Sequence, residues 1–320
     1  MNVLSLDGLD AQNPLAFFAA LGLLRVTDFH SRESGSPRPK LSFVDTGALT
    51  PRLHTALRND DVFQLVLDDA AKCASDPALR LAYSDDGDEV APETSGATRD
   101  LKPPPSVARA YLARLAAGDR RAADLGAAFF SELVQQGTDA NRAKPTAFHF
   151  TSGQQQFLKM AEDLRVGLTA EDVREALHGP WRNDSQLPSF AWDASITRMY
   201  ALRASNPSGE KRGSIAAANW LGLQALAFFP VAVERGRLMT TAVVGGWKDA
   251  VFTWPAWEPS LGVATIAALL RTDVRKMSAR EWAAWGITNV FSSNIQRPDK
   301  YGSFAPAAVV VPRATPRDRR

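Results

Sequence analysis

Residues 13 to 25 are the strongest structural signal in the chain. They form an almost wholly apolar run that follows a strand-like segment at residues 3 to 6. Asn13 is suited to cap the free amides of a first helical turn, and Pro14 fits the first helical position. Apolar residues occur on every side of this helix rather than on one stripe. We therefore expect a buried helix that other elements must cover.

The chain is long enough to bury a substantial core, with 320 residues of which 45% are hydrophobic. Helical spacing and strand-like alternation are interspersed without a regular βαβ rhythm, which favours an α+β fold of mixed helices and short strands in two lobes. The expected helices are 60–74, 106–117, 120–136, 154–166, 169–178, 262–270 and 279–285, and the expected strands are 41–44, 79–83, 145–150, 240–244, 251–253 and 307–311.

Composition suggests a division near residue 180. The expected N-terminal α+β lobe spans 1–180, with a flexible acidic insertion at 84–105 that is too polar to order itself. A basic, tryptophan-rich C-terminal lobe spans 181–311, and 312–320 forms a basic tail. Residues 1–180 carry 19 Lys and Arg against 25 Asp and Glu, whereas the remainder carries 18 against 10. A surface that faces a polyanion is therefore expected in the later part.

Two features bear on location. The longest apolar stretch, 215–233, contains Asn219 and Gln224, so we expect a buried helix of a water-soluble protein rather than a membrane span. The first residues have neither a positive segment nor an uninterrupted apolar core, which predicts a cytoplasmic protein without a membrane partner. Cys73 is the single cysteine, and we expect a buried, unreactive thiol.

Catalytic motifs are weak. The turn at residues 6–9 lacks the glycines or lysine of a phosphate loop, and no two histidines have the spacing of a helical metal pair. His149 is expected as a hydrogen-bonded histidine at a core edge. Three carboxylates of the later part, Asp184, Asp193 and Glu210, leave a metal-dependent nuclease open as an alternative. No cofactor is indicated.

Aromatic and basic side chains are interleaved between residues 189 and 222. Arginine and lysine here suit phosphates, while Tyr200 or Trp220 suits stacking on an unpaired base. The structural alternative places Trp192 in the core and pairs Asp193 with a nearby arginine. The candidate contacts are Arg198, Tyr200, Arg203, Lys211 and Arg212.

Further basic groups follow. Arg271 and Arg275 lie four residues apart and share a helical face if the helix continues, with Lys276 beside them. These three residues form a second candidate contact with nucleic acid. Arg297 and the arginines of the tail add positive charge near the end of the chain.

Two motifs resemble those of large-subunit-like proteins from subtype I-G (formerly I-U) CRISPR interference complexes. The first is the glycine-containing turn at 6–9, Asn13-Pro14-Leu15 and the run Ala-Leu-Gly-Leu-Leu-Arg at 20–25. The second combines Trp-Asp at 192–193, Tyr-Ala-Leu-Arg-Ala at 200–204, Asn-Pro-Ser at 206–208 and Ala-Asn-Trp-Leu at 218–221. Together they cover about a quarter of the chain.

The resemblance implies a non-enzymatic subunit of a Cascade-type, RNA-guided ribonucleoprotein complex for antiviral defence. Such a subunit binds DNA and RNA, and its partners are the other effector subunits, guide RNA, target DNA and a recruited helicase-nuclease. The alternatives left open are the nuclease named above and a protein-only scaffold subunit of a defence complex.

Overall fold

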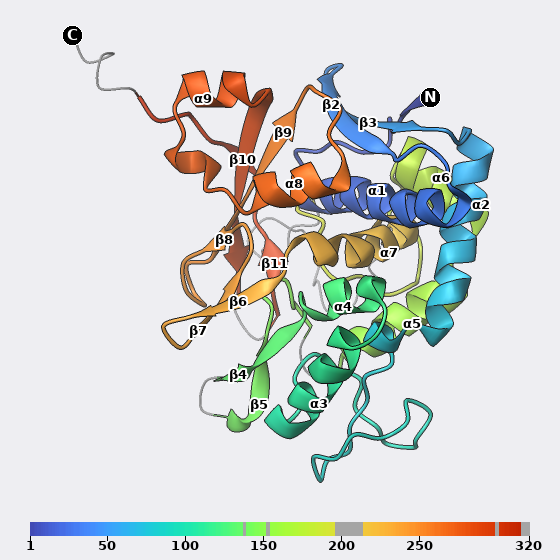
Figure 1. Ribbon diagram of the computed structural model, residues 1–320, viewed down its shortest axis with the longest axis vertical. Coiled ribbons are helices and arrows are strands. Elements are labelled where there is room, and N and C mark those ends of the chain that lie inside the picture. The colour runs from blue at the N-terminus through green and yellow to red at the C-terminus, as the bar shows by residue number, and fades with distance from the viewer. Residues whose placement is uncertain (137–138, 152–153, 196–213, 298–300, 315–320) are drawn as a thin grey trace, which may run out of the picture.

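The chain is an α+β protein, as predicted, and Figure 1 shows its arrangement in a computed structural model. The structure describes residues 1–136, 139–151, 154–195, 214–297 and 301–314. The helices are α1 (Pro14–Ser34), α2 (Asn59–Lys72), α3 (Pro105–Ala116), α4 (Arg120–Gly126), α5 (Phe157–Gly167), α6 (Ala170–His178), α7 (Ala216–Ala225), α8 (Val263–Leu270) and α9 (Ala279–Ala284). The strands are β1 (Asn2–Ser5), β2 (Lys40–Asp45), β3 (Leu49–Thr55), β4 (Phe130–Gln136), β5 (Asp139–Pro145), β6 (Val231–Glu234), β7 (Arg237–Thr240), β8 (Val243–Val244), β9 (Val251–Trp257), β10 (Ile287–Gln296), β11 (Ser303–Phe304) and β12 (Ala308–Val309).

Helix α1 begins as predicted, with the Asn13 side chain accepting a hydrogen bond from the Leu15 amide and Pro14 in the first turn. It packs against α7, which lies alongside it in Figure 1. The two backbones approach closely at Gly22, where a Cβ atom would lie 1.8 Å from the Leu221 carbonyl oxygen. Both resemblance motifs thus contribute to one helix pair, since α7 carries the second motif's Ala-Asn-Trp-Leu.

The strands form small antiparallel sheets. Strands β1, β3 and β2 form a three-stranded sheet in that order, and β10 pairs with β9, β11 and β12 while β8 extends the sheet beyond β9. The pairs β4–β5 and β6–β7 are separate two-stranded ribbons. Both larger sheets lie next to α1 in Figure 1. This arrangement encloses the apolar helix from several sides.

The buried apolar residues on both sides of residue 180 form one continuous cluster. Hydrogen bonds cross that position within it: for example, the indole of Trp254 donates to the Ala11 carbonyl at 2.9 Å, and that of Trp257 donates to the Leu41 carbonyl at 2.8 Å. The division into two lobes stays a prediction, which an unfolding experiment can test against these contacts.

Three predicted elements are wrong. The helix expected at 120–136 ends at Gly126, and 130–136 forms strand β4 because it pairs with β5. The strand expected at 145–150 instead lies earlier in the chain, as β5, which ends at Pro145. Residues 147–148 form a turn. Residues 79–83 form no strand, although Tyr83 makes isolated bridges to Glu89 and Thr98.

Other boundaries moved. Helix α1 continues to Ser34, beyond the apolar run at 13–25, and Gly35 ends the helix in a left-handed conformation. The apolar stretch 215–233 divides into α7, a short 3-10 turn and β6. Its polar side chains are paired as expected: Asn219 accepts from the Phe190 amide, and Gln224 accepts from Arg25.

No described helix combines the length and apolar character needed to cross a membrane. Residues 84–98, most of the expected acidic insertion, form turns that are largely exposed, whereas Asp100 and Leu101 are buried. Cys73 is buried at the end of α2, as predicted.

Candidate functional site

A basic pocket of about 340 Å³ lies between α1, α4 and α8. Its apolar wall comes from α8, from Ala227 and Phe228 after α7, and from Phe29 of α1. Five arginines and two aspartates are the charged residues among the described lining: Arg25, Arg32, Arg38, Arg120, Arg271, Asp28 and Asp124. The pocket therefore carries an excess of positive charge beside an apolar surface.

The two aspartates are already paired. Asp28 accepts from Arg32 at 3.1 Å and also from Arg38, while Asp124 accepts from Arg120 at 2.6 Å. Arg271 caps the C-terminus of α8 and is exposed, and no carboxylate in the described part of the chain forms an ion pair with it. Its guanidinium is thus available to an anion that enters the pocket.

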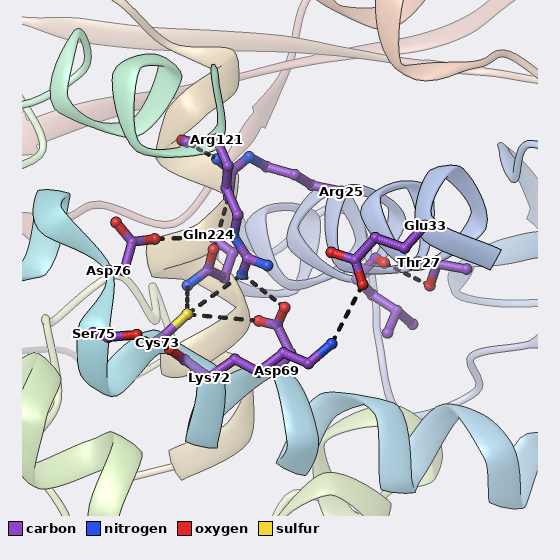
Figure 2. A network of polar contacts seen from close by, with 11 residues as sticks. Arg25, Thr27, Glu33, Asp69, Lys72, Cys73, Ser75, Asp76, Arg121 and Gln224 are labelled. Atoms are coloured by element: carbon purple, nitrogen blue, oxygen red, sulfur yellow. Dashed lines mark hydrogen bonds and ion pairs between the residues drawn. The ribbon is translucent and has the colours of Figure 1, made fainter. Parts of the chain in front are cut away.

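Arg25 lies at the base of the pocket, and Figure 2 shows the polar network around it. Its Nη1 donates to Gln224 Oε1 of α7 at 2.7 Å, and its Nη2 donates to the Arg121 carbonyl at 2.7 Å. Burial, and secondarily the charge of Arg121, lower the Arg25 pKa to about 10. The side chain is therefore still protonated at neutral pH, and its orientation is fixed from two sides.

The Arg121 side chain occupies the neighbouring part of this network. It forms an ion pair with Asp69 of α2 at 2.7 Å, and its Nη2 also donates to Cys73 Sγ at 3.3 Å. Burial, together with the charge of Asp69, raises the pKa of the Cys73 thiol to about 12. The thiol is therefore protonated at neutral pH, in agreement with the predicted unreactive cysteine.

Three arginines surround one aromatic ring at the pocket. The guanidinium carbons of Arg25, Arg32 and Arg121 lie 4.9, 5.5 and 5.1 Å from the centroid of Phe29. All three guanidinium groups are already bonded within the protein, Arg25 to Gln224, Arg32 to Asp28 and Arg121 to Asp69. They place positive charge around Phe29, and Arg271 is the group left to bond directly to a phosphate that enters the pocket.

Among the predicted contacts that fall on described residues, only Arg271 lines this pocket. Helix α8 ends at Leu270, so the helical face expected for Arg271 and Arg275 does not form. Arg275 and Lys276 instead both pair with Asp273, at 2.8 and 3.3 Å. Their charges are partly neutralised by that carboxylate. Arg198, Tyr200, Arg203, Lys211 and Arg212 lie outside the described residues.

The structural alternative for residues 189–222 is supported in part. Trp192 is fully buried, as that reading expected, and Asp193 Oδ1 accepts from Asn13 Nδ2 at 2.7 Å and from the Ser195 amide at 2.8 Å. The possibility that Trp220 stacks on a base is wrong, because its side chain is wholly buried in α7.

The nuclease carboxylates receive little support. Asp193 is buried and hydrogen-bonded, Asp184 is exposed and paired with Arg182 at 3.4 Å, and Glu210 lies outside the described residues. Within the described ranges, no three His, Cys, Asp or Glu side chains are grouped so that they could hold a metal ion.

His149 is buried and hydrogen-bonded, as predicted. Its Nε2 lies 2.8 Å from Asp100 Oδ1 and 2.7 Å from Thr151 Oγ1. Both contacts use the same ring nitrogen, whereas a nucleophilic triad uses the two nitrogens separately. Although burial opposes it, the interaction with His149 lowers the pKa of Asp100 to about 2.

Sequence reasoning missed most of the pocket. Arg25 and Arg32 are seven residues apart, which places them on one face of α1, and this spacing was the available signal. Arg38 and Arg120 lie in segments that only the packing of α1, α4 and α8 brings together.

Comparison with known proteins identifies no relative: no family model, curated protein or solved structure matches the chain.

Proposed function

We propose that this chain is a non-enzymatic nucleic-acid-binding subunit of a CRISPR RNA-guided surveillance complex that contributes to target DNA binding in antiviral defence. In this proposal it works in the cytoplasm beside the other effector subunits, guide RNA and the recruited helicase-nuclease. The observation that carries the proposal is the arginine pocket between α1, α4 and α8.

The charge balance of the pocket supports a phosphate ligand. Its two carboxylates are engaged by Arg32, Arg38 and Arg120, so Arg271 and the fixed Arg25 are left without a carboxylate partner among the described residues. Phosphate groups of nucleic acid take such contacts without regard to sequence. In an RNA-guided complex, base pairing reads the sequence while protein contacts hold the backbone.

The sequence adds a second region of positive charge. Residues 198–212 carry the candidate contacts Arg198, Arg203, Lys211 and Arg212 of the central motif. The place of the chain in a CRISPR complex depends on the resemblance of its two motifs, whereas nucleic-acid binding depends also on the pocket.

The test is binding of labelled single-stranded and duplex DNA by the purified protein across a salt series, with and without magnesium. Arg271→Glu should weaken binding several-fold and lower the slope of log affinity against log salt by about one, because one phosphate contact is lost. The double variant with Lys211→Glu and Arg212→Glu should weaken binding further.

Arg109→Glu is the matched control for charge. Arg109 is exposed on α3, lies outside the pocket and forms no ion pair with a described residue, so the same reversal should leave affinity nearly unchanged. Cleavage of DNA with magnesium would support the nuclease instead. Equal binding by wild type and the pocket variants, with loss of complex assembly on substitution of surface aromatics, would support the scaffold.

A further inference from the structure

A second cationic and aromatic site lies at the end of β10, apart from the arginine pocket. Trp247, in the turn after β8, is 49% exposed, and the guanidinium carbon of Arg297 lies over its ring at 4.1 Å from the centroid. The contact covers part of the indole and leaves the remainder open to solvent. The cation–π contact with Arg297 holds the exposed indole in place.

Arg297 is fixed by the protein but has no counter-charge among the described residues. Its Nη2 donates to the Ala147 carbonyl at 2.7 Å, and its guanidinium carbon lies 5.5 Å from the Phe150 ring centroid. Burial lowers its pKa to about 10, so the group is still charged at neutral pH. A half-buried cation that bonds only to carbonyl oxygens retains affinity for an anion.

The surroundings of Arg297 are basic. Arg297 and Lys144 of β5 both line a cavity of about 60 Å³, and no acidic residue lines this cavity in the described part of the chain. The turn itself carries Lys248 and Asp249. The Asp249 carboxylate already accepts from the Gly246 amide at 2.7 Å, which stabilises the turn that presents Trp247.

We infer that Trp247 and Arg297 bind one unpaired nucleotide of a single-stranded nucleic acid, with the base stacked on the exposed indole and the phosphate held by Arg297 and Lys144. The inference deepens the proposed function and depends on it for its macromolecular ligand. Aromatic stacking on a base tolerates any sequence, so this contact would hold a displaced strand without reading it.

Trp285 provides a matched control within the same chain. It is also 49% exposed, yet no described arginine or lysine lies over its ring. Trp285→Ala therefore removes an equally exposed tryptophan that has no arginine or lysine over its ring among the described residues. Arg297→Lys keeps the charge but loses the planar group that stacks on the indole.

The experiment measures binding of fluorescent oligothymidine and of an abasic strand of the same length by wild type, Trp247→Ala and Trp285→Ala. Trp247→Ala should weaken binding of oligothymidine about five-fold or more without changing the salt slope, because no charge is removed. It should leave affinity for the abasic strand unchanged. Arg297→Lys should weaken binding of oligothymidine, and Trp285→Ala should match wild type.

A second measurement separates this inference from the proposed function. Thymidine monophosphate, titrated against the protein, should quench part of the tryptophan emission in wild type and not in Trp247→Ala. Equal affinity of wild type and Trp247→Ala for oligothymidine would overturn the platform while the arginine pocket still binds DNA. If wild type binds no strand, the proposed function fails, and absence of quenching by the nucleotide overturns the platform as well.

Discussion

At the scale of single residues, Cys73 shows how the interior of the arginine network controls reactivity. Its thiol is buried and contacts Arg121, and its pKa is raised to about 12 by burial and by Asp69. We expect iodoacetamide to alkylate it about a thousand-fold more slowly than a free cysteine at pH 8, because the thiolate is nearly absent and access is blocked. Mass spectrometry of the native and the guanidinium-unfolded protein gives the comparison. Rapid modification of the native protein would contradict the burial of this thiol.

Asp100 makes a second prediction at this scale. The folded protein holds its pKa at about 2, below the ordinary value near 4, so the carboxylate contributes stability above pH about 4 that is lost as the pH falls toward 2. Asp100→Asn should lower the free energy of unfolding at pH 7 by about 2 kcal/mol. It should also reduce the loss of stability that wild type shows between pH about 4 and pH about 2. Urea unfolding across this range measures both. Asp163→Asn, which breaks the exposed pair with Lys159, should follow wild type, and a parallel pH profile for Asp100→Asn would contradict the prediction.

At the scale of elements, the crossing of α1 and α7 depends on Gly22. An alanine there would place its Cβ 1.8 Å from the Leu221 carbonyl oxygen, so the two helices would have to separate. Gly22→Ala should lower the free energy of unfolding by about 3 kcal/mol or more. Gly262→Ala is the control, since no atom lies within 4 Å of its Cβ position and its φ is −86°. It should cost less than about 1 kcal/mol in urea unfolding, and equal losses for the two variants would show that the close approach is not limiting.

At the scale of the whole molecule, one buried cluster joins residues on both sides of residue 180. Helix α1 packs on α7, and the indoles of Trp254 and Trp257 donate to carbonyl groups of the first 41 residues. We therefore expect one cooperative unfolding transition, in which tryptophan emission and far-ultraviolet circular dichroism coincide. Fragments 1–180 and 181–320, each expressed alone, should show no cooperative transition. Two separated transitions of the intact chain would instead support two independent lobes.

Several elements could be predicted because their signals are local. Asn13 and Pro14 specify the start of α1, and Thr169 specifies the start of α6, where Asp172 completes a reciprocal capping box. Strand β3 was missed because Pro51 argues against a central strand, although the Pro51 carbonyl still accepts from the Leu6 amide. Strand β10 was missed because its Ser and Asn residues lack the composition typical of strands.

The sequence by itself determined the buried character of α1, the α+β class and the excess of positive charge after residue 180, because each depends on composition or on neighbours along the chain. Only the tertiary structure decided where arginines gather into a pocket, and four of the five arginines there precede residue 180, outside the part of the chain with the expected excess of positive charge. Arg25, Arg38, Arg120 and Arg271 come from four segments, and the packing of α1, α4 and α8 places them around one pocket. Packing also assigned opposite roles to the tryptophans, since Trp220 is enclosed by the core while Trp247 remains exposed beside Arg297. Contacts between distant segments depend on which surfaces are buried together, and no local pattern encodes that choice.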